Sequence, residues 1–145
     1  MRLALFADIH ANRQAFAACL DAARARGAER LVCLGDIVGY GADPEWAVDT
    51  VVGLVSEGAI AVRGNHDNAI GVPSDSMNAD AQAAIDWTRG RLNGEQKAFL
   101  AGLPILREQG LALGAAIVGS TLLALAAGAW AFVLVARLTG ETDDG

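Results

Sequence analysis

The sequence predicts an α/β fold, with a mostly parallel sheet and flanking helices in the order βαβαβ, followed by one apolar C-terminal helix. Three observations support this fold class. Short apolar runs alternate with helical patterns over residues 1–103. A polar cluster follows each of three apolar runs, and residues 111–136 carry no charge. The chain therefore divides into an N-terminal α/β part and an apolar C-terminal segment.

The first five elements alternate between strand and helix. The first apolar run is continuous, as in a strand that is buried on both faces. Asn12 can cap the helix that follows. Asp43 and Pro44 offer N-cap and first-turn chemistry to the next helix, which Gly58 ends. In chain order, we expect a strand at residues 2–7, a helix at 13–26, a strand at 30–34, a helix from 44 through 55 and a strand at 59–62.

Two further helices are expected before the apolar segment. A turn-rich loop covers residues 71–76, and Asn78 or Asp80 can start a helix that runs through Leu92. Residues 93–103 predict a short helix that Pro104 stops. These helices complete the expected N-terminal domain, residues 1–106.

The uncharged segment predicts a transmembrane helix. As a helix, residues 111–136 would be about 39 Å long, against a hydrocarbon core of about 30 Å. We therefore expect a linker at 107–110, a single membrane pass at 111–138 and an acidic tail at 139–145. The excess of Arg and Lys before the segment favours an inside location for the N-terminal domain. A buried hairpin in a soluble core is the alternative.

Composition and short sequence patterns indicate which partners and which location to expect. The net charge is −6 and the basic residues are scattered, so we expect no nucleic acid as a structural partner. The apolar stretch at residues 3–7 is too short for a secretory signal, which predicts a cytoplasmic N-terminal domain. Small residues at four-residue spacing in the apolar segment favour close pairing of two helices, and hence a homodimer. These are Gly110 with Gly114, Ala115 with Gly119, and Ala124 with Gly128.

Three polar clusters carry the chemistry. Asp8 and His10 follow the first strand, Asp36 follows the second, and Asn65 and His66 follow the third. Residues just past the carboxyl ends of neighbouring parallel strands converge on one crevice. Carboxylate, imidazole and amide ligands together suit Mn, Fe, Zn or Mg. Each cluster alone is an ordinary turn, but the three in this order predict one metal site.

The clusters together resemble the signature of the calcineurin-like metallophosphoesterases, specifically their bacterial branch. Asp-x-His is matched at residues 8–10, Gly-Asp-x-x-Gly at 35–39 and Gly-Asn-His-Asp at 64–67. Longer stretches are also similar, including Asp-Ile-His-Ala-Asn at 8–12 and Gly-Asp-Ile-Val-Gly-Tyr-Gly at 35–41. The resemblance covers residues 1–106.

The resemblance implies a dinuclear site of divalent metal ions. In this reading Asp8 and His10 bind the first metal, Asp36 bridges both, and Asn65 binds the second. A metal-activated hydroxide would then hydrolyse a phosphomonoester or a phosphodiester. The expected substrate is a small-molecule or nucleotide phosphoester.

The resemblance also implies catalytic side chains. His66 would be the general acid, oriented by Asp67. Arg63 precedes the third motif, where its cation could hold a phosphate oxygen or could simply be a solvated charge at a strand end. Tyr40 lines the pocket or only packs.

The chain departs from the family downstream. Family members continue with further strands that carry additional ligating histidines, whereas this chain contains two histidines, His10 and His66. We therefore expect a truncated half-sandwich with an exposed strand edge, an incomplete second metal site and one bound ion. The prediction is a metal-dependent phosphoesterase that is impaired by the missing ligands. The alternative is a non-catalytic, membrane-anchored remnant that binds a metal or a partner.

Overall fold

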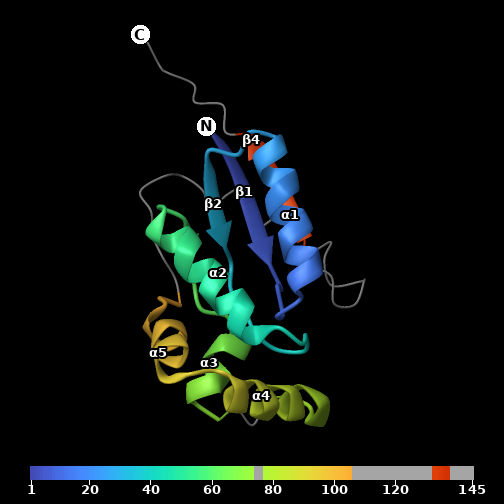
Figure 1. The fold of residues 1–145 in the computed structure, drawn as a ribbon, viewed down its shortest axis with the longest axis vertical. Helices are drawn as coiled ribbons and strands as arrows, with labels where there is room; N and C mark the ends of the chain where they lie inside the picture. The colour runs from blue at the N-terminus through green and yellow to red at the C-terminus, as the bar shows by residue number, and fades with distance from the viewer. Residues whose placement is uncertain (74–76, 106–131, 138–145) are drawn as a thin grey trace.

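A four-stranded sheet forms the centre of the protein, with the strand order β3-β2-β1-β4. The computed structural model describes residues 1–73, 77–105 and the strand at 132–137. β1 is parallel to β2, β2 is parallel to β3, and β4 is antiparallel to β1 (Figure 1). The strands are β1 (Arg2–Ala7), β2 (Arg30–Cys33), β3 (Ile60–Ala61) and β4 (Phe132–Arg137).

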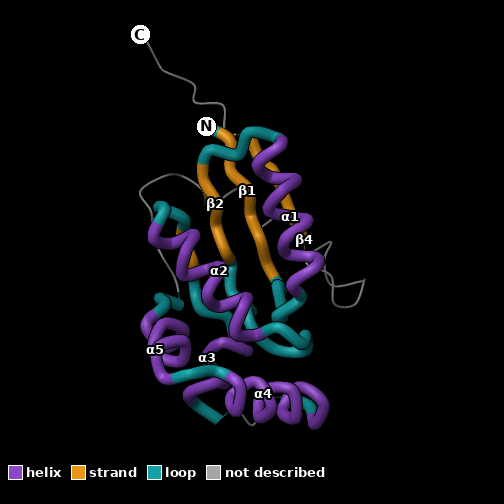
Figure 2. Tube along the Cα trace, viewed as in Figure 1, coloured by secondary structure: helices purple, strands orange, loops and turns teal. Residues whose placement is uncertain are grey.

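Five helices occupy the described part of the chain. Two of them, α1 and α2, lie in front of the sheet in Figure 2, whereas α3, α4 and α5 lie together beyond the carboxyl ends of the parallel strands. This arrangement places helix α3 at the edge of the sheet where the polar clusters emerge. The helices are α1 (Arg13–Ala25), α2 (Pro44–Ser56), α3 (Asn65–Gly71), α4 (Ala79–Arg91) and α5 (Gly94–Gly102).

The main core lies between the sheet and its helices. Phe6 of β1 and Phe16 of α1 are both fully buried, and their rings meet edge to face with centroids 5.5 Å apart. Alternate residues of a strand face opposite sides of a sheet, so the neighbours of Phe6 point away from α1. Leu3, Leu5 and Val32 accordingly form a second, smaller buried cluster.

Two helix starts follow the predicted capping chemistry, whereas Asp43 lies at the N-cap of α2 without a capping hydrogen bond from its side chain. The side chain of Asn12 accepts a hydrogen bond from the amide of Ala15 at 3.1 Å. Asn78 does the same for Ala81 at 2.8 Å, so Asn78 rather than Asp80 caps α4. Each cap satisfies one amide that has no partner within its own helix.

The C-terminal prediction is wrong over residues 132–137. These residues belong to the predicted transmembrane helix 111–138, but they form β4, which pairs with β1 from Arg2 opposite Arg137 to Ala7 opposite Phe132. β4 also covers the edge of β1 that we expected to be exposed. An apolar run gives the same hydropathy signal whether it is a strand or a helix, and the aromatic and β-branched residues here favour a strand.

The rest of the expected C-terminal region lies outside the described residues. This applies to the linker from residue 107, the predicted span at 111–131, its small-residue pairs and the acidic tail 139–145. Within the described ranges, no helix is long and apolar enough to cross a bilayer.

Candidate metal centre

The three polar clusters meet because their strands are parallel neighbours. Asp8 directly follows β1, Asp36 lies in the loop after β2, and Gly64 lies in the loop after β3. The first two loops are joined by a hydrogen bond from the amide of His10 to the carbonyl of Asp36, 2.8 Å long. The expected convergence at one edge of the sheet is therefore present.

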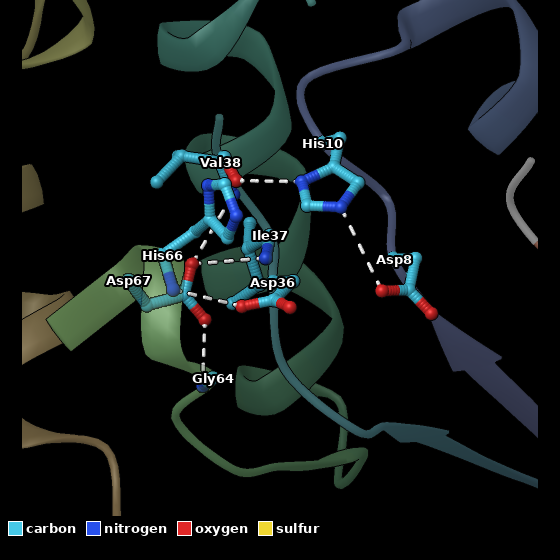
Figure 3. Close-up of polar contacts among 8 residues, drawn as sticks. All are labelled: Asp8, His10, Asp36, Ile37, Val38, Gly64, His66 and Asp67. Atoms are coloured by element: carbon cyan, nitrogen blue, oxygen red, sulfur yellow. Dashed lines mark hydrogen bonds and ion pairs between the residues drawn. The ribbon is translucent and has the colours of Figure 1, made fainter. Parts of the chain in front are cut away.

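Three of the four predicted metal ligands form a compact group. Asp8, His10 and Asp36 each offer one ligand atom, and these atoms lie within 4.8 Å of one another. Nε2 of His10 is 3.6 Å from Oδ1 of Asp8 (Figure 3). The side chain of Asp8 is 48 % exposed and that of His10 is 13 % exposed, so the group opens to solvent at Asp8. One nitrogen and two carboxylates suit a divalent transition metal or Mg²⁺.

The imidazole of His10 is oriented for metal binding. Nδ1 of His10 lies 3.2 Å from the carbonyl oxygen of Val38, which can only accept a hydrogen bond. In the tautomer that donates from Nδ1, Nε2 is the metal-binding nitrogen, and it lies on the side of Asp8. Metal-binding histidines commonly donate their other N–H to a backbone carbonyl in this way. The residues therefore fit a bound metal ion.

The same residues have an unusual backbone. Asp8, His10, Ala11 and Asp36 have φ values of 53°, 46°, 55° and 52°. Such left-handed conformations are uncommon for residues with a side chain and cluster at functional sites. All three members of the metal-ligand group are among them, so the loops are held in strained conformations that present these ligands.

The third motif begins with Gly64 because no side chain fits at this position. A Cβ atom at Gly64 would overlap the carboxylate and the amide nitrogen of Asp36. Two residues later, the amide of His66 donates a hydrogen bond of 2.9 Å to Oδ1 of Asp36. The third loop thus packs directly on the central carboxylate of the group and fixes its orientation.

Asp67 connects the second and third loops. Its carboxylate is 1 % exposed and accepts hydrogen bonds from Ile37 at 2.9 Å, from Val38 at 3.1 Å and from Gly64 at 3.0 Å (Figure 3). Among the described residues, the hydrogen bonds of this carboxylate go to backbone amides and none goes to the His66 ring. The orientation of the His66 ring by Asp67 stays a prediction, and these bonds hold the backbone of the loops after β2 and β3.

Burial shifts the titration of both residues. It raises the pKa of Asp67 to about 6, although the three amide hydrogen bonds oppose the rise. Burial also lowers the pKa of His66. The charges of Asp36 and Asp8 oppose this decrease, and the charge of His10 adds to it. Burial thus favours the neutral form of the His66 imidazole. In that neutral form the ring can donate one hydrogen bond.

His66 lies beside the metal-ligand group and shares a cluster of three rings with His10 and Tyr40. Ring centroids are 4.7 Å apart for His10 and His66, and 5.0 Å apart for Tyr40 and each histidine. A Cβ atom at Gly39 would lie 2.8 Å from Nδ1 of both histidines, so glycine allows the two rings to approach this backbone. We refer to His10, Tyr40 and His66 as the ring cluster.

Two predicted site residues, Asn65 and Arg63, lie outside the metal-ligand group. Asn65 is exposed and begins α3, next to Gly64. The guanidinium of Arg63 donates from Nη1 to the carbonyl of Ala101 at the end of α5, 2.9 Å away. Arg63 thus makes a contact between elements that neither of its expected roles included. A phosphate-binding role for Arg63 and a metal-binding role for Asn65 stay predictions.

Sequence reasoning missed Arg89 of α4. Its Nε and Nη2 donate to the carbonyls of Ile70 and Ala69, at 2.8 and 2.7 Å, near the C-terminus of α3. These carbonyls have no partner within a helix that ends there, so Arg89 completes them. Helix α3 carries His66 and Asp67 at its N-terminal end, and Arg89 stabilises its C-terminal end. A contact across nineteen residues has no periodic signal in the sequence.

Comparisons with known proteins find similar sequences and similar structures. The family model described as calcineurin-like phosphoesterase matches residues 1–132, which extends past the boundary at 106 that we expected. The uncharacterized protein MJ0912 of Methanocaldococcus jannaschii is 38% identical over 111 residues, which are 75% of this chain and 44% of that protein. The chain thus spans less than half the length of this relative.

Two solved structures are similar. The crystal structure of a metallophosphoesterase from Sphaerobacter thermophilus superimposes with a TM-score of 0.62 at 38% identity, covering 75% of this chain and 43% of that one. A second crystal structure, of a candidate diadenosine tetraphosphatase, gives a TM-score of 0.51 at 25% identity over 71% of this chain and 43% of that one. The match of the family model over most of the sequence shows that the chain belongs to the calcineurin-like phosphoesterase family.

Proposed function

We propose that this chain binds a divalent metal ion at Asp8, His10 and Asp36 and hydrolyses phosphoester bonds there. The observation that carries the proposal is the convergence of three ligand atoms within 4.8 Å, all on residues with left-handed backbone. Bound there, a divalent cation supplies Lewis-acid polarisation of a phosphoryl oxygen. Family membership supports a hydrolase, and the geometry supports this position for its site.

The surrounding residues have separate tasks in this proposal. The backbone of His66 orients Asp36, and the His66 ring faces the same space as the metal-ligand group. Nδ1 of His66 is buried without a hydrogen-bond partner among the described residues, against Gly39. Nε2 is then the nitrogen that can pass a proton to the departing oxygen.

A similar protein supports one class of substrate within this proposal. One similar structure is described as a candidate diadenosine tetraphosphatase, which favours nucleotide phosphoesters among the small-molecule substrates. A cytoplasmic location and a second ion at Asp36 and Asn65 stay predictions.

A second function is metal binding without turnover. The sequence offers two histidines, and both lie in the ring cluster. A site with three protein ligands can hold an ion but still lack groups that hydrolysis needs. This reading predicts the same metal affinity as the first and no metal-dependent rate.

Calorimetry and kinetics separate the two functions. Mn²⁺ is titrated into the whole chain, and hydrolysis of an aryl phosphodiester and of diadenosine tetraphosphate is followed with and without Mn²⁺. Asp36→Asn keeps the side-chain shape and should abolish both binding and rate. Asp21→Asn removes the same charge from a side chain that is 82 % exposed on α1, and it should change neither.

The outcomes are distinct. Metal-dependent hydrolysis that is lost in Asp36→Asn supports the phosphoesterase. Binding without hydrolysis supports the metal-binding module. Equal Mn²⁺ affinity in wild type and Asp36→Asn would overturn the proposed metal centre.

A further inference from the structure

We propose that the exposed ring of Tyr40 is a binding platform for a planar aromatic group of the substrate, such as a nucleobase. The inference rests on the proposed function, because it places this group beside the site where the phosphoester would bind. Tyr40 would then help to determine substrate specificity. From the sequence, it could either line the pocket or only pack.

Tyr40 lies next to both histidines of the site. Its ring centroid is 5.0 Å from that of His10 and 5.0 Å from that of His66. The interplanar angles are 66° and 57°, so neither imidazole stacks flat on the phenol ring. Flat, offset stacking on the phenol is therefore not already used by a neighbour in the ring cluster.

The backbone on both sides of Tyr40 is held in place. Gly41 donates its amide to the carbonyl of His10 at 2.8 Å, and a Cβ atom at Gly41 would overlap the same carbonyl. On the other side, Gly39 has φ of 129° and packs against both histidine rings. The position of Tyr40 is thus tied to that of His10, which belongs to the metal-ligand group.

Tyr40 remains half open to solvent despite these contacts. It is 51 % exposed, whereas its partners in the ring cluster are largely buried. An aromatic ring on a backbone that is already held in place loses less conformational entropy when a ligand stacks on it. Stacking of a base on such a ring is typically worth about 1–3 kcal/mol and needs no particular base. The ligand class is therefore a phosphoester with a planar aromatic group.

Fluorine NMR tests the platform without relying on turnover. Tyr40 is the one tyrosine of the chain, so labelling with ring-fluorinated tyrosine gives one signal. AMP and ribose phosphate are titrated in the presence of Mg²⁺, since they share the phosphate and sugar and differ in the base. We expect AMP to shift the signal and to bind about tenfold more tightly than ribose phosphate.

Three variants sharpen the comparison, with affinities measured by calorimetry. Tyr40→Ala should bring AMP to the affinity of ribose phosphate and leave ribose phosphate unchanged. Tyr40→Phe keeps the ring and should retain the preference for AMP. Trp87→Ala removes another aromatic side chain of similar exposure, 49 %, from α4 and should have no effect on either ligand.

Each result decides the matter. A tenfold preference for AMP that Tyr40→Ala removes and Tyr40→Phe keeps supports the platform, even if the chain hydrolyses nothing. Equal affinities of wild type for AMP and ribose phosphate would overturn it. Equal loss of both ligands in Tyr40→Ala would also overturn it, because the ring would then only support the histidines. Absence of AMP binding at millimolar concentration overturns it as well.

Discussion

The amide of His66 donates to Oδ1 of Asp36 at 2.9 Å, so the residue proposed to supply a proton also orients the central carboxylate of the metal-ligand group. The two functions are coupled through one loop. A change that moves this loop should alter metal affinity and proton transfer together, whereas a change on the far side of the sheet should alter neither.

Gly64→Ala should weaken metal binding. The added Cβ would overlap the carboxylate and amide nitrogen of Asp36, and these backbone and ligand atoms can give way only by moving the site. We expect Mn²⁺ affinity to fall about 10- to 100-fold, as for other changes to groups that orient a ligand. Calorimetric titration measures it.

Gly53→Ala is the matched control for that variant. Gly53 lies inside helix α2, and nothing lies within 4 Å of the position of its added Cβ. Alanine should stabilise the helix by about 0.5–1 kcal/mol and leave Mn²⁺ binding intact. Similar Mn²⁺ affinities for Gly64→Ala and Gly53→Ala would contradict the packing of the third loop on Asp36.

Asp67→Ala should strongly destabilise the fold. It leaves three backbone amides, of Ile37, Val38 and Gly64, without their acceptor. An unsatisfied buried donor costs about 1–3 kcal/mol, so the free energy of unfolding should fall by at least about 3 kcal/mol. Urea denaturation measures the change. A loss below about 1 kcal/mol, the size expected for the exposed Asp21→Ala, would show that these amides find other partners.

Asp67 should also make stability depend on pH. Its folded pKa of about 6 lies above the ordinary value of 3.8, so the folded state binds the proton more tightly. The stability that this proton provides is full below about pH 4 and is lost as pH rises through about 6. His66 acts in the opposite direction, because its pKa is lowered on folding and stability is lost as pH falls below its ordinary value.

The comparison with Asp67→Asn isolates the first effect. The amide side chain does not titrate, while His66 is present in both proteins. With a chelator present, the free energy of unfolding of the wild type minus that of Asp67→Asn should fall as pH rises from 4 to 7. A difference that grows over this range would mean that the three amide hydrogen bonds outweigh burial and hold the pKa of Asp67 low.

Arg89→Ala should loosen α3 and weaken the site that it carries. Two hydrogen bonds from the guanidinium to α3 carbonyls disappear, and bonds to charged groups are worth about 1.5–3 kcal/mol. We expect a loss of about 2 kcal/mol in unfolding free energy and weaker Mn²⁺ binding. Arg89→Lys should recover part of both, because it keeps the charge but not the planar fork.

Arg91→Ala serves as the control on the same helix. Arg91 is half exposed and pairs with Glu45 at 2.9 Å, a surface ion pair that contributes about 0–1 kcal/mol. Equal effects of the Arg89 and Arg91 substitutions on stability and metal affinity would refute a specific role for Arg89.

The alternating strands and helices of the N-terminal part could be predicted because short-range hydrophobic patterns and helix-capping residues determine them. The first strand ends at Ala7 as expected, and Asn12 and Asn78 cap their helices as expected. Helix α3 was missed because its sequence carries site chemistry instead of an amphipathic pattern. β4 was missed because apolar character alone does not distinguish a strand from a helix, and its partner β1 lies at the other end of the chain.

The candidate site divides in the same way. The proximity of Asp8, His10 and Asp36 could be predicted because the loops after parallel strands lie at one edge of the sheet. The three amides that bind Asp67 and the carbonyls that bind Arg89 could not, since they depend on how loops and helices pack. The contact of Arg63 with Ala101 likewise depends on the position of α5.

The antiparallel pairing of β4 has a consequence for how the protein responds to change. Phe132 lies opposite Ala7, the residue immediately before Asp8, so two segments that are remote in the chain share one ladder at the threshold of the reactive loop. A shift in the register of that ladder would change which residue of β4 lies opposite Ala7. Because β4 pairs along the whole of β1, residues 132–137 help to hold the strand from which Asp8 emerges.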